Sequence, residues 1–208
     1  MSDESRHWVE YYDVTAERPA WQTVSKAIEL FAAEDEAAGR APDPPRLAVD
    51  LGCGAGRDVR QLLRAGWRVI AVDSEPEAGM ALEKHVEPES RSRLEIVIAD
   101  IAEYPIPPCD LVNASVSLQF LGADSYAATW KRIVEALPPG GRFSAMIYGD
   151  RDESASDPDY TMVPRYRIQS DLWGFEIETW VEREEDTKLA LGDPHHLHMI
   201  EFVARRLS

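Results

Sequence analysis

The sequence has 208 residues, of which 44% are hydrophobic, and it carries a formal net charge of −16 at pH 7. This length and composition predict one compact globular domain, and no apolar run approaches the roughly 20 residues that a membrane-spanning helix needs. The negative charge argues against nucleic acids and membranes as partners, because contacts with phosphate require clustered Lys and Arg.

The cellular setting is predicted from the cysteines and from the first residues. Cys53 and Cys109 are the only cysteines, so no disulfide framework is expected. Residues 1–10 are polar and lack the basic start and apolar stretch of a secretory signal. We therefore expect a cytoplasmic protein, either a monomer or a small homo-oligomer.

The first 45 residues are predicted to form a helical cap and a linker. Residues 1–38 read as helical, with Arg18-Pro19 at a helix start and apolar residues such as Trp21 and Phe31 at helical spacing. Residues 39–45 (GRAPDPP) are rich in helix breakers. The main domain is then predicted over residues 46–208, and the two parts are expected to form one compact unit.

From residue 46 onward, strands and helices alternate. Strands are predicted at residues 46–50, 67–72, 93–99, 109–114 and 142–148. Three helices are predicted between them: one that Gly66 ends, one that starts at a Ser74-Glu77 capping box and runs to about Val86, and one that Asp124 caps.

The alternation stops after Tyr148. A polar segment follows, then a weak helical signal at residues 168–173 and two strands at 175–181 and 197–204. The pattern predicts an α/β fold with a single Rossmann-like, doubly wound sheet. We expect seven strands, mostly parallel, with an antiparallel C-terminal pair and helices on both faces.

The most informative motif is DLGCGAG at residues 50–56, between a predicted strand and a predicted helix. Ligands bind at this end of open parallel sheets, and glycines let the backbone turn and approach them closely. A dinucleotide loop would need Gly-x-Gly-x-x-Gly, but Arg57 or Val59 occupies the last position in the two possible registers.

The charge of this motif points to a different ligand. Asp50 would repel a pyrophosphate but would attract the ammonium and sulfonium groups of S-adenosylmethionine. The motif therefore predicts S-adenosylmethionine as the cofactor, with S-adenosylhomocysteine as the product. A tight strand-to-helix turn without a ligand is the alternative.

Two further acids follow predicted strands. Asp73 is placed to accept hydrogen bonds from both ribose hydroxyls, or to stabilise the start of the next helix by its charge. Asp100 is placed to contact the adenine amino group, with the Ile101 N–H available for a ring nitrogen. Asp is also common in turns, which is the alternative for Asp100.

The ordered stretches VDLGCGAGRD, VIAVDSEP, ADI, CDLVNAS and LPPGGRF resemble the motifs of class I S-adenosylmethionine-dependent methyltransferases. The resemblance implies that Asp50 and the glycine loop line the methionine end of the cofactor, that Asp73 holds the ribose, and that residues 113–115 flank the reacting methyl group. The expected cofactor-binding residues are Asp50, Gly52, Cys53, Gly54, Gly56, Asp73, Ser74, Asp100, Ile101, Asn113 and Ser115.

Within that class the chain is similar to a small bacterial branch related to tellurite-resistance and thiopurine-type methyltransferases. LVNASVSLQFL, YGDRDE and HHLHMIEFVARR carry this resemblance. The chain has Gln119, Leu197 and Glu201 where that branch usually has Pro, Trp and His. These departures lie near the expected substrate pocket.

No catalytic residue is assigned from the sequence. The pocket candidates are Tyr12, Arg18, Asp150, His196 and His198. His196 and His198 share one strand face, because side chains alternate along a strand. They are candidates for a base or an anion-binding pair, for hydrogen-bonded structural histidines, or for metal ligands, and no metal site is predicted.

The sequence therefore predicts an enzyme that moves a methyl group by in-line displacement to a small-molecule acceptor: a thiol, a chalcogen oxyanion or a metabolite heteroatom. A soft nucleophile needs mainly positioning, whereas a hydroxyl or amine more often needs a base. The alternatives are a cofactor-binding module without catalysis, suggested by the few candidate bases, and a nicotinamide-dependent reductase, which the failed dinucleotide registers disfavour.

Overall fold

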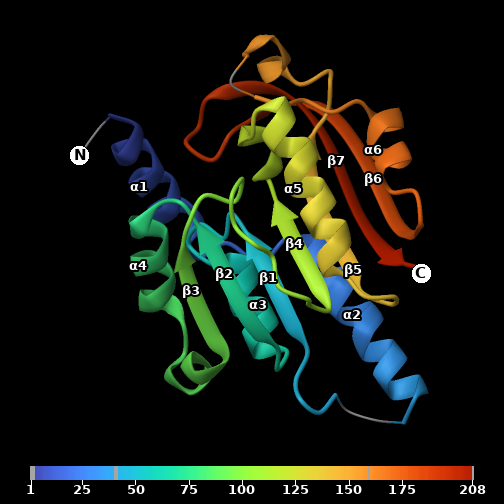
Figure 1. Cartoon of the computed structure of the whole chain (residues 1–208). Helices are drawn as coiled ribbons and strands as arrows, with labels where there is room; N and C mark the ends of the chain where they lie inside the picture. The colour runs from blue at the N-terminus through green and yellow to red at the C-terminus, as the bar shows by residue number, and fades with distance from the viewer. Residues whose placement is uncertain (1–2, 40–41, 159, 208) are drawn as a thin grey trace.

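The structure is a computed structural model that describes residues 3–39, 42–158 and 160–207. A seven-stranded sheet has helices on both faces (Figure 1). The strands are β1 (Leu47–Leu51), β2 (Arg68–Asp73), β3 (Leu94–Ile98), β4 (Leu111–Ser115), β5 (Arg142–Tyr148), β6 (Phe175–Lys188) and β7 (Pro194–Arg206). The helices are α1 (Asp3–Thr15), α2 (Gln22–Ala37), α3 (Arg57–Arg64), α4 (Pro76–His85), α5 (Ala123–Ala136) and α6 (Arg165–Asp171), with short 3-10 helices η1 (Pro88–Arg93), η2 (Leu118–Phe120) and η3 (Glu153–Ser156).

The order of the strands in the sheet is β3-β2-β1-β4-β5-β7-β6. Strands β1 to β5 are parallel, whereas β7 runs antiparallel to both β5 and β6. The chain moves outward from β1 to β3 and then returns to the other side of β1, so the switch point lies between β1 and β4, where Asp50 pairs with Asn113. The predicted doubly wound sheet with an antiparallel C-terminal pair is confirmed.

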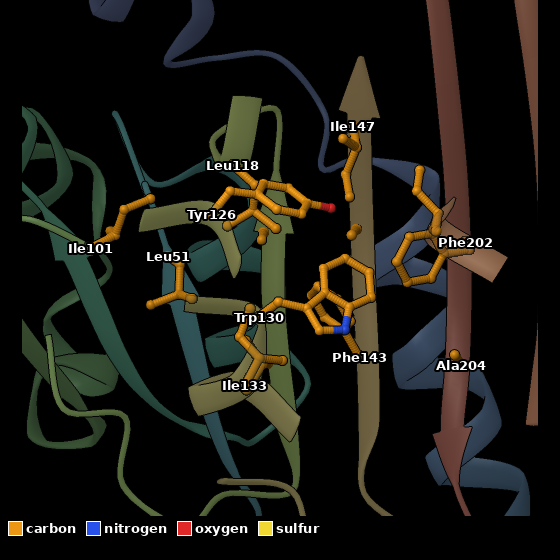
Figure 2. Packing of buried hydrophobic residues seen from close by; sticks show 14 of the residues in the cluster. Leu51, Ile101, Leu118, Tyr126, Trp130, Ile133, Phe143, Ile147, Phe202 and Ala204 are labelled. Atoms are coloured by element: carbon orange, nitrogen blue, oxygen red, sulfur yellow. The ribbon is translucent and has the colours of Figure 1, made fainter. Parts of the chain in front are cut away.

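Both faces of the sheet are covered by apolar side chains. On one face, the Trp130 ring of α5 lies edge-on to Phe143, with centroids 5.2 Å apart, and Phe143 meets Phe202 at the same distance (Figure 2). On the other face, α2 and α3 bury Phe31 and Leu62. Because α2 is part of this core, the N-terminal part of the chain contributes to the central packing of the domain through this helix.

The start of α2 differs from the prediction. The helix begins at Gln22 rather than at Arg18-Pro19, and its N-cap residue Trp21 makes no side-chain cap. The Asp58 carboxylate of α3 instead accepts the Trp21 N–H at 2.9 Å. Residues 16–21 therefore form a bend between α1 and α2, and residues 40–41 of the predicted linker lie outside the described part of the chain.

Two predicted caps are wrong. The N-cap of α4 is Glu75 without a side-chain cap, so no Ser74 capping box forms. The Asp73 side chain accepts the Glu75 N–H. The N-cap of α5 is Gly122, so Asp124 lies in the first turn of the helix and stabilises it only by its charge.

The last two strands are longer than predicted. They form a hairpin that extends past the sheet and curves over its end towards α1 (Figure 1). The extension, residues 182–188, is almost entirely charged, so it lacks the apolar pattern that predicts a buried strand. In the part of the chain that the structure describes, no helix has both the length and the apolar character needed to cross a membrane.

Candidate cofactor and acceptor site

The glycine loop, residues 52–56, joins β1 to α3 at the carboxyl end of the parallel strands. The Gly52 and Cys53 N–H groups donate to the Val72 carbonyl at 2.8 and 3.0 Å, which ties the loop to β2. Gly56 has a φ of 77° and is the N-cap of α3. The loop therefore lies beside the switch point, which is where ligands bind in such sheets.

Two glycines of the loop are required by packing as well as by backbone conformation. Gly52 and Gly56 both have positive φ. A Cβ on Gly52 would lie 2.4 Å from the Ser117 Cβ, and a Cβ on Gly56 would lie 2.1 Å from the Leu82 Cδ1. Any larger residue at either position would push the loop away from the sheet or from α4.

Asp73 is fixed beside the same loop. Its Oδ2 accepts the Gly54 N–H at 2.8 Å and its Oδ1 accepts the Glu75 N–H at 3.1 Å. The residue is only 9% exposed. Burial raises the pKa of Asp73, although both hydrogen bonds favour the ionised form. The carboxylate is thus oriented by the backbone of the loop and by the start of α4.

Tyr12 of α1 covers the glycine loop. Its hydroxyl donates a hydrogen bond to the Asp73 carboxylate. Burial and the nearby Asp73 charge raise the pKa of Tyr12, so the phenol stays protonated. A Cβ on Gly54 would meet the Tyr12 ring at 3.5 Å. The Asp73 carboxylate therefore already accepts a hydrogen bond from a hydroxyl group, which is the contact that a ribose would make. Asp73 and the glycine loop thus fit S-adenosylmethionine.

Aromatic side chains from three segments meet above η2. The Trp8 ring lies edge-on to Phe120 with centroids 5.5 Å apart, and Phe120 lies 5.3 Å from Tyr160. Phe120 is 42% exposed. These rings give an apolar wall next to the end of β4, where a planar or apolar molecule can pack.

A buried polar network lies beneath the glycine loop. The Asn113 Nδ2 donates to the Asp50 Oδ1 at 2.7 Å and to the Asp58 Oδ2 at 3.0 Å. None of the three residues is more than 3% exposed. Burial, and then the Asp58 charge, raise the pKa of Asp50 well above its usual range. A cation bound next to the loop would favour the ionised form of this pair.

This network changes how two residues are interpreted. Asn113 was expected to flank the reacting methyl group, but its amide is fully buried and already bonded to two carboxylates. Asn113 therefore positions Asp50, and its direct contact with a cofactor stays a prediction. Sequence reasoning missed Asp58, whose only signal is an acid in the first turn of the helix after the loop.

Asp100 caps the turn after β3. Its Oδ1 accepts the Ala102 N–H at 2.8 Å, so the structure shows the turn role that was the alternative interpretation. The Ile101 N–H makes no backbone hydrogen bond within the described residues. That donor is free for a ligand, and the contacts of Asp100 and Ile101 with adenine stay predictions.

The thiol of Cys53 lies in the glycine loop. Cys53 is buried, and burial followed by the Asp73 charge raises its pKa well above the usual range, so it is an unreactive thiol.

Val116, directly after Ser115 at the end of β4, has a φ of 58°. A β-branched residue rarely adopts this conformation, and strain of this kind gathers at functional sites. The sequence gives no signal for it.

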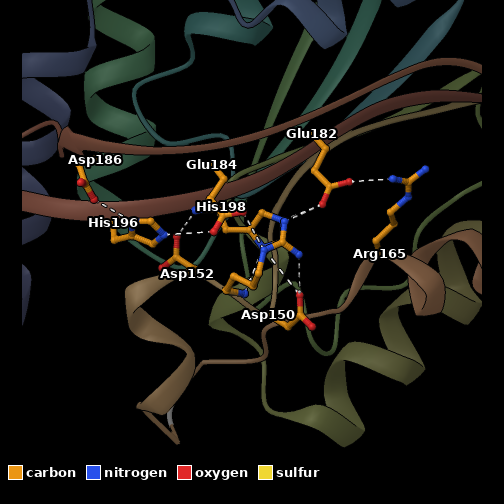
Figure 3. A network of polar contacts seen from close by, with 9 residues as sticks. Asp150, Asp152, Arg165, Glu182, Glu184, Asp186, His196 and His198 are labelled. Atoms are coloured by element: carbon orange, nitrogen blue, oxygen red, sulfur yellow. Dashed lines mark hydrogen bonds and ion pairs between the residues drawn. The ribbon is translucent and has the colours of Figure 1, made fainter.

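His198 is held on both ring nitrogens (Figure 3). Its Nδ1 accepts the Arg151 N–H at 3.1 Å, and its Nε2 faces the Glu182 Oε1 at 3.0 Å. Because Nδ1 is an acceptor, we assign the neutral tautomer that donates from Nε2. With no exposed surface and both nitrogens used, His198 fastens the loop after β5 and is not free to act as a base.

His196 lies further along the same face of β7, as predicted, but on the exposed part of the hairpin. Its Nδ1 is 2.7 Å from the Asp186 Oδ1 and its Nε2 is 3.4 Å from the Glu184 Oε1 (Figure 3). These two carboxylates raise the pKa of His196, Asp186 most. Among the described residues, no three His, Cys, Asp or Glu side chains are placed to hold a metal ion.

The remaining pocket candidates are separated from one another. Asp150 lies 3.8 Å from the His198 Nδ1 and its side chain is 47% exposed. Arg18 donates to the Ala190 carbonyl at 3.4 Å, which joins the bend after α1 to the tip of the hairpin. Of the five candidates, Tyr12 is the one that the structure brings into contact with a predicted cofactor residue.

Known proteins share the central part of this sequence. A family model described as a methyltransferase domain matches residues 48–141. A carboxy-S-adenosyl-L-methionine synthase from Erwinia tasmaniensis is 34% identical over 97 residues, which cover 44% of this chain and 39% of that protein. Its counterpart from Ectopseudomonas mendocina is 29% identical over 201 residues, covering 91% of this chain and 78% of that protein. These matches support the predicted resemblance to class I S-adenosylmethionine-dependent methyltransferases.

The match to the curated relatives is partial. The chain spans less than half the length of the Erwinia tasmaniensis and Photorhabdus laumondii synthases, 39% and 43%. The methyltransferase domain and the predicted cofactor class are nevertheless confirmed, whereas the residue-level contacts stay predictions.

Solved structures share the fold of this chain. TehB from Haemophilus influenzae superposes with a TM-score of 0.71 at 18% identity, over 90% of this chain and 62% of that one. The 1,6-didemethyltoxoflavin-N1-methyltransferase from Burkholderia thailandensis, with S-adenosylhomocysteine bound, gives a TM-score of 0.57 at 22% identity, over 90% of this chain and 79% of that one. At these identities the likeness concerns the fold alone.

The loop after β5 depends on Asp152. Its buried carboxylate accepts the His198 N–H and the Ser154 N–H, each at 3.0 Å, and faces the His195 Nε2 at 2.9 Å. We expect Asp152→Ala to lower the free energy of unfolding in urea by about 1–3 kcal/mol, because buried donors lose their acceptor. The exposed Asp150→Ala is the control and should change it by less than about 0.5 kcal/mol. Equal changes in both variants would contradict this role.

Proposed function

We propose that this protein binds S-adenosylmethionine in the glycine-loop site and transfers its methyl group to a small-molecule acceptor, releasing S-adenosylhomocysteine. The observation that carries the proposal is the Asp73 carboxylate, which is bonded to the Gly54 N–H of the loop and already accepts a hydroxyl hydrogen bond from Tyr12. A ribose in this position would meet an acceptor of the right charge and orientation.

Each part of the site has a role under this proposal. Asp73 accepts the ribose hydroxyls, and the free Ile101 N–H donates to the adenine ring. Asp50 supplies negative charge beneath the methionine end. When bound, the cofactor supplies an activated methyl group on a sulfonium. Tyr12 and α1 cover this end of the site and exclude water, which strengthens the electrostatic contacts inside it.

The acceptor is proposed to be a small molecule with a soft or already ionised nucleophile, such as a thiol or a chalcogen oxyanion. This follows from the lack of a free histidine among the candidates, because both nitrogens of His198 are engaged and His196 lies in an exposed ion-pair ladder. The aromatic wall of Trp8, Phe120 and Tyr160 is a suitable contact surface for it. The Burkholderia neighbour acts on a small molecule, which agrees with this class of acceptor.

Titration calorimetry tests the proposal directly. We expect the purified protein to bind S-adenosylmethionine and S-adenosylhomocysteine but not NADH. Incubation with thiols and chalcogen oxyanions, followed by mass spectrometry, should then show S-adenosylhomocysteine and a methylated acceptor. Binding without turnover of any acceptor would favour a non-catalytic module. A carboxylated cofactor as product would favour the activity for which the curated relatives are named, and tight NADH binding would contradict the proposal.

A further inference from the structure

A cavity, separate from the glycine-loop site, lies between α3 and the bend that joins α1 to α2. Its volume is about 540 Å³. Arginines dominate its polar lining: Arg18, Arg57, Arg60 and Arg64, with Glu17 as the one acidic lining residue among the described residues. In a chain with a net charge of −16, four arginines around one cavity are a local reversal of charge.

Helix geometry concentrates three of these charges. Arg57, Arg60 and Arg64 are spaced three and four residues apart, so they lie on one face of α3. Like charges at this spacing repel one another and destabilise a helix unless something neutralises them. The arrangement therefore calls for a counter-charge on the cavity side.

Two of these arginines have buried nitrogens without an acceptor in the described part of the chain. The Nε atoms of Arg57 and Arg60 are buried and have no hydrogen-bond acceptor among the described residues. Arg60 is 7% exposed and donates from Nη2 to the Ala16 carbonyl, which carries no net charge. Burial, and then the neighbouring Arg64, lower the pKa of Arg60.

The nearby carboxylates are few and already engaged. Asp58 lies 4.0 Å from the Arg57 Nε, but both of its oxygens accept hydrogen bonds from other residues. Glu87 pairs with the exposed Arg64 at 2.7 Å. The charges that remain on the cavity wall are therefore positive in sum.

We infer that this cavity binds a small multivalent oxyanion of the phosphate class. The planar guanidinium fork matches the oxygens of phosphate, and four arginines line this cavity. A small ligand is favoured over a polyanion, because the rest of the chain would repel a nucleic acid or an anionic membrane. The site lies apart from the cofactor residues, since neither Asp73 nor residues 50–56 line the cavity.

Titration calorimetry with sodium phosphate and sodium pyrophosphate, at constant ionic strength and without S-adenosylmethionine, tests this inference. We expect binding to the unmodified protein. Arg64→Gln and Arg57→Gln should each weaken it by about tenfold or more, because each removes a charged hydrogen bond. Arg68→Gln removes the same charge from an exposed position outside the cavity and should leave the affinity unchanged. Circular dichroism confirms folding, and Arg64, with a side chain 58% exposed, is the safer variant.

A repeat titration with saturating S-adenosylhomocysteine separates this site from the cofactor site. Unchanged phosphate affinity supports two sites. Displacement of phosphate would overturn the inference, because the arginines would then hold the carboxylate of the cofactor. No heat with either anion, or equal losses in Arg64→Gln and Arg68→Gln, would also overturn it. None of these outcomes depends on methyl transfer, so the proposed function stands or falls separately.

Discussion

Asp73→Ala is expected to weaken S-adenosylmethionine binding by about 100-fold or more. Each ribose hydroxyl loses a charged acceptor, and a hydrogen bond to a charged group contributes roughly 1.5–3 kcal/mol. The variant also leaves the N–H groups of Gly54 and Glu75 without their present partner. We therefore expect a lower free energy of unfolding too, by about 1–3 kcal/mol, and calorimetry should be run well below the unfolding temperature.

A matched variant separates ribose binding from helix stabilisation, which was the alternative role of Asp73. Glu77 lies in the first turn of α4, so Glu77→Ala removes one negative charge from the same helix end. If Asp73 acts through the helix dipole, the two variants should behave alike. If it holds the ribose, Glu77→Ala keeps its affinity. Unchanged affinity in a folded Asp73→Ala would rule out the ribose contact.

The central sheet was predictable because of how its strands are buried. Strands β1, β4 and β5 are covered on both faces, so they read as continuous apolar runs. Their predicted limits agree with the observed ones to within two residues. The length of the β6–β7 hairpin was underestimated for the converse reason. Its extension in β6 carries charged residues such as Arg183 and Glu184, so the sequence there lacks the alternation of apolar and polar residues that predicts a strand.

The candidate site was predictable in its backbone but not in its contacts. Glycines at positive φ and an acid after β2 are visible in the sequence. Which side chain fills the space next to each glycine depends on tertiary packing: Ser117 at Gly52 and Tyr12 at Gly54 come from distant segments. The same holds for Asn113, whose buried bonds to two carboxylates follow from strand register and not from local sequence.

A single buried cation joins the N-terminal segment to the C-terminal hairpin. Arg142 is 1% exposed, and its guanidinium donates to both oxygens of Glu178 at 2.7 and 2.8 Å and to those of Glu34 at 2.7 and 3.1 Å. It also lies 4.2 Å from the centroid of the Phe31 ring. These contacts link β5 to α2 on one side and to β6 on the other.

Arg142→Ala is expected to lower the free energy of unfolding by about 3–5 kcal/mol, because it leaves the Glu178 carboxylate, whose side chain is only 13% exposed, without its partner. Urea denaturation measures this loss. The double variant Arg142→Met with Glu178→Leu should recover most of it, since an apolar pair of similar volume avoids the unpaired charge. A double variant as unstable as Arg142→Ala would mean that the ion pair itself stabilises the fold. In either case the partners of Arg142 include Glu34 of α2, so the first 45 residues are expected to unfold together with the sheet and not as a separate cap.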